Sequence, residues 1–128
     1  MHRPDSSSRR RGRWPALLLA AFACACSDAP QPPHVPGGDA SRGRAAIERY
    51  GCVACHTIPG LPAHGANVGP PLVNLAERGY LGGVLPNTPQ QLVRWLQDPP
   101  AVAPRTVMPN LGVSAAEAAD IAAYLYSH

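Results

Sequence analysis

Cys52, Cys55 and His56 lie in the pentapeptide Cys-Val-Ala-Cys-His near the middle of the chain. Two thiols at this spacing can add to the two vinyl groups of one porphyrin, and the adjoining imidazole then lies beneath the iron. The spacing is the attachment motif of c-type haem. We therefore predict one covalent haem c, with thioethers at Cys52 and Cys55 and His56 as an iron ligand.

Three other interpretations fit the same pentapeptide: a thioredoxin-like redox pair, half of a zinc site, or a chance match. A redox pair is expected between a strand and a helix. A zinc site needs two more ligands close by. The sequence around the pentapeptide offers neither context.

Met108 is the candidate for a second iron ligand. Residues 99–107 include three prolines, so we expect an extended arm that ends at Met108. If Met1 is removed with a leader, Met108 is the only methionine of the mature chain. A thioether is a soft ligand, and His/Met ligation raises the potential of a haem. The alternative is a methionine that packs in the core as filler.

The N-terminus has the pattern of an export signal. Five arginines lie in the first 13 residues, and an apolar run follows from Trp14 to Cys26. A basic segment, a short apolar segment and small residues are typical of a secretory signal peptide, which we assign to residues 1–26. The run is shorter than the ~20 apolar residues of a membrane span. A buried N-terminal helix is the alternative.

Cys24 and Cys26 lie where bacterial lipoproteins are cleaved and acylated, although the Leu expected three residues upstream is missing. Either could carry a lipid anchor, and Cys26 is preferred because a polar linker follows it. The alternative is a soluble protein that loses both cysteines with its signal. Residues 27–38 are rich in proline and predict a stiff linker. The expected location is the bacterial periplasm, with or without a membrane anchor.

The positive charge belongs to the leader. The chain has 11 arginines, no lysine and eight acids, and the part after Cys26 keeps six arginines and seven acids. A formal net charge of −1 does not indicate a nucleic-acid-binding surface. We therefore expect no nucleic-acid partner.

Helix-start signals organise the remaining residues. Asp39 can cap a first helix, Thr88 precedes a Pro and a Gln in a cap pattern, and Ser114 with Glu117 forms a capping box. Gly43 lies inside the first helix, which suggests close approach of another helix. No convincing strand appears. The expected helices cover 40–50, 72–78, 88–98 and 114–127.

Taken in order, these motifs resemble class I monohaem cytochrome c over residues 39–128. The stretch Gly-Val-Leu-Pro-Asn-Thr-Pro that begins at Gly83, with the later Trp-Leu-Gln-Asp-Pro and Met-Pro, also resembles cytochrome domains joined to subunit II of haem-copper oxidases. The motifs that carry the first resemblance are Cys52-x-x-Cys55-His56, Gly69-Pro70-x-Leu72, Thr88-Pro89, Trp95-Leu96, Met108-Pro109 and Ile121-Ala-Ala-Tyr124-Leu125.

The resemblance implies a small all-α domain of four or so short helices around a haem, preceded by the signal peptide and the Pro-rich linker. It makes His56 the proximal ligand and Met108 the distal ligand. The Pro70 carbonyl accepts the His56 ring N–H, Leu72 faces the haem, and Arg78 binds a propionate.

Further residues are also compared with the family pattern. Trp95 takes the place of an aromatic residue beside the methionine sulfur, and Thr106 or Asn87 adds polar contacts near the propionates. Arg105 stands where the family often has Gly. This departure bears on the turn that precedes Met108 and not on Met108 as the ligand.

The implied function is electron transfer rather than catalysis, with a respiratory membrane complex as the partner. A terminal oxidase is the first choice, and a dehydrogenase or reductase is the second. A haem enzyme or sensor with a labile Met108 ligand is a further alternative. The absence of lysine means that no strongly acidic docking partner is implied.

Overall fold

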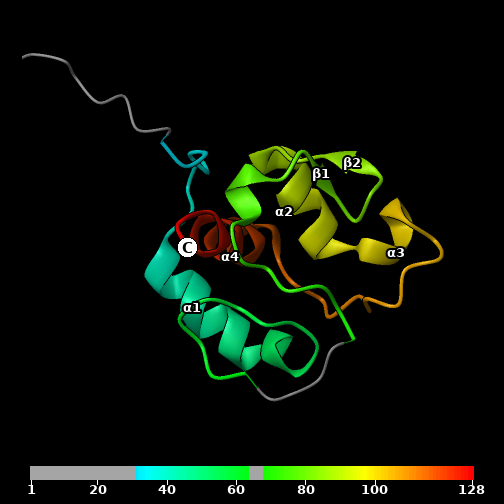
Figure 1. The fold of residues 1–128 in the computed structure, drawn as a ribbon, viewed down its shortest axis with the longest axis horizontal. Helices are drawn as coiled ribbons and strands as arrows, with labels where there is room; N and C mark the ends of the chain where they lie inside the picture. The colour runs from blue at the N-terminus through cyan, green and yellow to red at the C-terminus, as the bar shows by residue number, and fades with distance from the viewer. Residues whose placement is uncertain (1–30, 64–67) are drawn as a thin grey trace, which may run out of the picture. The chain divides into compact units, whose positions relative to one another are not determined.

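Short helices form most of the regular structure in the computed structural model, which describes residues 31–63 and 68–128 (Figure 1). The predicted signal peptide, Cys24, Cys26, residues 27–30 and His64 lie outside the described residues. In chain order the elements are α1 (Ala40–Arg49), η1 (Cys52–Ala54), η2 (Leu75–Glu77), β1 (Tyr80–Leu81), β2 (Leu85–Pro86), α2 (Pro89–Gln97), α3 (Pro99–Val102) and α4 (Ala115–Tyr126).

Side-chain caps begin the three longer helices at the predicted positions. The Asp39 carboxylate accepts the N–H of Arg42, and the Thr88 hydroxyl accepts the N–H of Gln91. Ser114 begins α4 with both bonds of a capping box. Such caps satisfy backbone N–H groups that have no partner inside the helix. The predicted starts of these helices are therefore confirmed.

Two predicted segments differ from the structure. The arm over 99–107 is not extended throughout, because Asp98 caps the short helix α3 and accepts the N–H of Ala101 at 3.3 Å. Two prolines occupy the first helical positions, where the missing N–H is tolerated. The helix expected over 72–78 is shorter than predicted and contains only the 3₁₀ turn η2.

A small hairpin also appears where no strand was predicted. The strands β1 and β2 pair antiparallel, with Leu81 opposite Leu85. The connection begins with Gly82 and Gly83, whose φ angles are +54° and +74°. Only glycine adopts this left-handed region without strain, so the Gly-Gly pair permits the turn.

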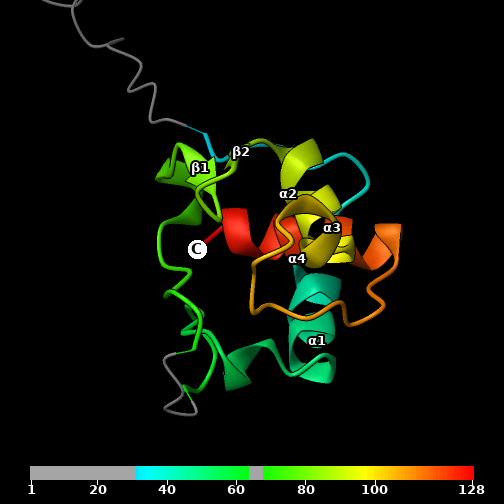
Figure 2. The same ribbon diagram turned by 90° about the vertical axis from the view of Figure 1, so that its right-hand side faces the viewer.

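The helices α1 and α4 lie side by side, as both ribbon views show (Figure 1 and Figure 2). At their crossing a Cβ on Gly43 would overlap the backbone of Asp120 and would lie 3.0 Å from the Cβ of Tyr124. The predicted close approach at Gly43 is therefore present, and Asp120 and Tyr124 of α4 make it. Ile47 and Ile121 are buried nearby, with 0% and 1% of their surfaces exposed.

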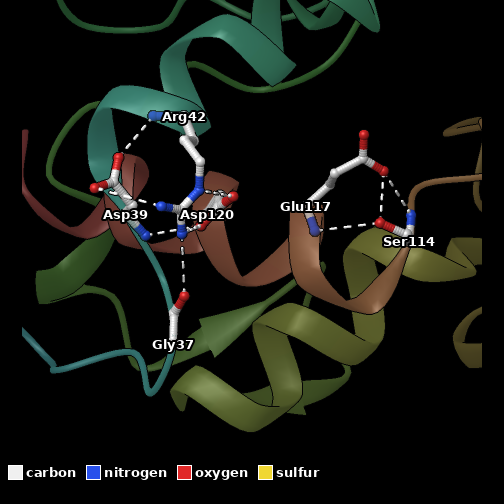
Figure 3. A network of polar contacts seen from close by, with 6 residues as sticks. All are labelled: Gly37, Asp39, Arg42, Ser114, Glu117 and Asp120. Carbon is white, nitrogen blue, oxygen red and sulfur yellow. Dashed lines mark hydrogen bonds and ion pairs between the residues drawn. The ribbon is translucent and has the colours of Figure 1, made fainter.

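A polar network joins the same two helices (Figure 3). Arg42 donates from Nε to Asp120 Oδ2 and from Nη2 to Asp120 Oδ1, both at 2.8 Å. The backbone N–H of Asp39 also donates to Asp120 Oδ1 at 2.8 Å. These donors hold the pKa of the Asp120 carboxyl below its usual value of 3.8, chiefly through the Arg42 hydrogen bonds.

The chain on either side of this helix pair also packs onto it. Val35, inside the predicted linker, is 5% exposed and belongs to the core, so packing begins before Asp39. At the other end, the ring of His128 stacks on Tyr124 with centroids 4.2 Å apart. In the part of the chain that is described, no helix has the length and apolar character of a membrane span.

Candidate functional site

An apolar cleft of about 650 Å³ brings the predicted ligands together. Cys52, Cys55, His56 and Met108 all line it, although 52 positions separate the imidazole from the thioether in the sequence. Its volume is within the range of about 300–1,000 Å³ that is usual for small-molecule and cofactor pockets. Most other lining residues are aliphatic or aromatic, and Arg78 and Arg105 supply guanidinium groups.

The two thiols come from a tight turn that directly follows α1. Cys52 begins η1, and its carbonyl accepts the N–H of Cys55 at 3.2 Å and of His56 at 3.0 Å. Both cysteines are free and partly buried. Burial raises the pKa of the Cys52 thiol above its usual value. Across 31–63 and 68–128, no group of three or more His, Cys, Asp or Glu is arranged to hold a metal.

The imidazole of His56 is held by the segment that follows the loop. Its Nδ1 lies 2.8 Å from the carbonyl oxygen of Pro70, as predicted. A carbonyl oxygen only accepts, so Nδ1 carries the hydrogen and Nε2 of the neutral ring keeps its lone pair. Gly69 passes directly beside the ring, and a Cβ there would overlap it. The Gly69 N–H donates to the Cys55 carbonyl at 2.8 Å, which ties this segment to the haem motif.

Met108 lines the cleft from the segment between α3 and α4. It is partly buried and packs against the core. The Met108 backbone N–H donates to Thr106 Oγ1 at 3.2 Å, and the Thr106 N–H donates to the Ala103 carbonyl at 2.9 Å. Thr106 therefore shapes the turn that carries Met108, and it also lines the cleft. Arg105, which stands where Gly is common in the family, is exposed and does not prevent this turn.

Arg78 lines the cleft while part of its guanidinium is bound to the backbone. Its Nη2 donates to the carbonyls of Pro71 and Val73 at 2.5 and 2.9 Å. The nitrogens Nε and Nη1 are left for a carboxylate such as a propionate. Asn87 was suggested as a contact of the propionates, but it does not line the cleft. Its amide instead donates to backbone carbonyls.

Leu72 and Trp95 complete the predicted set, and both line the cleft. The Leu72 N–H donates to the Thr57 carbonyl at 2.8 Å. The Trp95 ring lies against Gly82, where a Cβ would come within 2.7 Å of it. Sequence reasoning did not assign Tyr50, Leu81 or Gly82 to the site. Leu81 and Gly82 belong to the hairpin, and the Gly-Gly pair was the one local signal for it in the sequence.

These residues fit a covalently attached haem. Two thiols lie beside an imidazole whose Nε2 is free, and a thioether lines the same apolar cleft. A guanidinium at the wall matches the carboxylate groups of the porphyrin edge. The chemistry of the donor set, rather than any one distance, makes this assignment.

Comparisons with known proteins show the family to which the chain belongs. The family model described as Cytochrome c matches residues 40–128. Cytochrome c oxidase subunit 2 of Alkalihalophilus pseudofirmus is 34% identical over 70 residues, which are 55% of this chain and 20% of that protein. The chain thus spans about a fifth of that relative's length. Cytochrome c2 from Rhodobacter sphaeroides, a crystal structure, aligns with a TM-score of 0.47 and 22% identity over 70% of this chain and 95% of that chain.

Proposed function

Because the chain belongs to the cytochrome c family and is a haem electron-transfer protein, we propose that it carries one His/Met-ligated haem c and passes single electrons within a respiratory chain. The observation that carries this proposal is the cleft that Cys52, Cys55, His56 and Met108 line together. The family membership supports the cofactor class, and the residue assignments are our own inference from the cleft.

In this proposal Cys52 and Cys55 would hold the haem through thioethers, and His56 and Met108 would be its iron ligands. The Pro70 carbonyl keeps the hydrogen of His56 on Nδ1, which leaves Nε2 for the metal. When bound, the haem supplies an iron that alternates between ferric and ferrous. His56 and Met108 would hold the iron in both oxidation states, and two retained ligands would keep the reorganisation that accompanies electron transfer small.

The cleft walls control the surroundings of the iron. Leu72, Trp95 and the buried Ile47 and Ile121 line the cleft and would keep water away from a bound iron. Arg78 and Thr106 supply donors for the propionates, and the guanidinium charge at this wall disfavours a more positive iron. A dry site with a thioether ligand and a nearby cation favours a raised reduction potential.

For the partner we propose a terminal oxidase. The support is the 34% identity to a stretch of a protein named cytochrome c oxidase subunit 2. That stretch is a minor part of the relative, so the inference concerns a docking or donor role and not the oxidase reaction. A periplasmic dehydrogenase or reductase is the competing partner.

We also propose export to the periplasm, based on the basic and apolar segments of residues 1–26. A lipid on Cys26 or Cys24 would keep the protein at the membrane, since several acyl chains anchor firmly.

The experiment is a reduced-minus-oxidised absorption spectrum of the exported protein, together with the intact mass of its mature form. A c-type spectrum and the added mass of one haem support the proposal. The same mass identifies the cleavage site and any lipid. A mature protein without covalent haem contradicts the proposed function, and a Cys52→Ala, Cys55→Ala variant provides the unattached control.

A further inference from the structure

Tyr126, near the end of α4, is connected to the cleft wall through Asn87. The Tyr126 hydroxyl donates to Asn87 Oδ1 at 2.7 Å. Asn87 Nδ2 in turn donates to the carbonyls of Leu75 and Arg78 at 2.7 and 2.8 Å. Both hydrogens of the amide are used, so Asn87 fixes the turn between η2 and β1 to α4.

Arg78 continues the connection towards the iron-binding imidazole. Its Nη2 donates to the carbonyls of Pro71 and Val73. Pro71 follows Pro70, whose carbonyl oxygen lies 2.8 Å from His56 Nδ1. Hydrogen bonds and covalent links together therefore connect Tyr126 to the segment that holds His56. Asn87 binds the backbone of Arg78, the Arg78 side chain binds the carbonyls of Pro71 and Val73, and the peptide bond joins Pro71 to Pro70.

We propose that Asn87 and Tyr126 are positioning residues for the proximal imidazole: they keep the segment 70–73 in place and so set the strength of the His56–Pro70 hydrogen bond. The proposal rests on the proposed function, because it concerns the iron ligand assigned there to His56. Neither Asn87 nor Tyr126 lines the cleft, so both act on the iron through Arg78 and Pro70.

The chemistry of the tyrosine suits this role. Tyr126 is 3% exposed, and burial raises its pKa to about 12. Its hydroxyl therefore stays protonated and donates throughout the physiological pH range. Without it, Asn87 Oδ1 loses its donor in a partly buried position, which favours rearrangement of the amide.

The direction of the effect follows from ligand basicity. A hydrogen bond from Nδ1 to a carbonyl makes the imidazole a stronger donor to the metal, and a stronger donor stabilises the ferric state. If the segment 70–73 loosens, the bond weakens and ferrous iron is relatively favoured. Loss of the Tyr126 hydroxyl is therefore expected to raise the reduction potential.

The test uses the holoprotein in four forms: wild type, Tyr126→Phe, Asn87→Leu and the double variant. Two quantities are measured, the equilibrium reduction potential and the hydrogen exchange of the Leu72 and Arg78 amides. We expect Tyr126→Phe to raise the potential and to speed exchange at both amides. Asn87→Leu should shift the potential and the exchange rates further. The double variant should match Asn87→Leu, because that single change already removes the acceptor of the Tyr126 hydroxyl.

Tyr124→Phe is the matched control for the exchange measurement. It removes a hydroxyl from the same helix, but that hydroxyl donates to the Pro59 carbonyl at 2.7 Å. We expect faster exchange near Leu61 and no change at Arg78.

Several outcomes overturn the proposal. They are an unchanged or lowered potential in Tyr126→Phe, additive shifts in the double variant, or the same loosening at Arg78 in Tyr124→Phe. If Asn87→Leu does not fold, Tyr126→Phe alone decides through its potential and its Leu72 exchange. A wild-type protein without haem instead contradicts the proposed function, so the two failures are distinguishable.

Discussion

Gly69 lies so close to His56 that a Cβ added to the glycine would overlap the imidazole ring. The chain can pass the ring at this distance only because the residue has no side chain. The next residue, Pro70, then presents its carbonyl oxygen 2.8 Å from Nδ1. The glycine and the proline therefore act together, the first by leaving room and the second by accepting the hydrogen bond.

Gly69→Ala should displace the imidazole or the segment that binds it. We expect a loss of stability of about 1–3 kcal/mol, which is usual when a well-packed site receives an extra methyl group. We also expect an altered absorption spectrum, since the metal ligand moves. Denaturant unfolding and the visible spectrum of the holoprotein measure both.

Gly79→Ala is the control for this variant, because a Cβ at Gly79 meets nothing within 4 Å. Its stability and spectrum should stay near those of the wild type. Wild-type behaviour of Gly69→Ala would mean that the close approach does not constrain His56.

Gly43→Ala should weaken the crossing of α1 and α4. The added Cβ meets the Asp120 backbone, which cannot rotate away as a side chain can. The expected loss is again about 1–3 kcal/mol in the free energy of unfolding, despite the better helix propensity of Ala. Ala45→Ser, at an exposed position of the same helix, should change stability by less than about 1 kcal/mol.

Arg42→Ala should leave the Asp120 carboxylate with a single donor, the Asp39 N–H. Asp120 is 7% exposed, whereas the Arg42 side chain is 62% exposed, so solvent moderates the effect. We expect a measurable loss of the free energy of unfolding, moderated by the exposure of Arg42. Glu48→Gln breaks the exposed Arg44–Glu48 pair and should lose about 0.5 kcal/mol or less, so equal effects would contradict this account.

Glu117 should make the stability of the domain depend on acid pH. Hydrogen bonds from Ser114 and Tyr50 lower its pKa from 4.5 to about 2. A carboxyl whose pKa is lower in the folded state stabilises the fold fully above the unfolded value. That contribution decreases as the pH falls from about 5 to about 2.

The matching experiment compares wild type with Glu117→Gln by denaturant unfolding across this pH range. The variant should be less stable than wild type at pH 6, and the difference should shrink towards pH 2. Some acid dependence should remain in the variant, because the pKa of Asp120 is also lowered. A stability difference that is constant with pH would contradict the assignment.

The sequence predicted those parts of the fold that depend on neighbouring residues. The caps at Asp39, Thr88 and Ser114 each act within three positions, so their residue types were sufficient to locate the starts of α1, α2 and α4. The pentapeptide at Cys52 likewise carries its own chemistry. The Pro70 acceptor came instead from the family resemblance, and the structure contains that bond.

Other features of the structure were not predicted from the sequence, for local as well as long-range reasons. The prolines after Asp98 suggested an extended arm, whereas the Asp98 cap makes them the first positions of α3. The Tyr126–Asn87 bond joins residues 39 positions apart and leaves no periodic pattern in the sequence.

The most direct measurement of the central claim compares the reduction potential and visible spectrum of wild type with those of Met108→Ala. The account requires one iron bound by His56 and by the Met108 sulfur. It therefore predicts a substantially lower potential and an altered ferric spectrum in the variant, with the covalent haem retained through Cys52 and Cys55. A Met108→Ala protein with the potential and spectrum of the wild type would show that the sulfur is not a ligand.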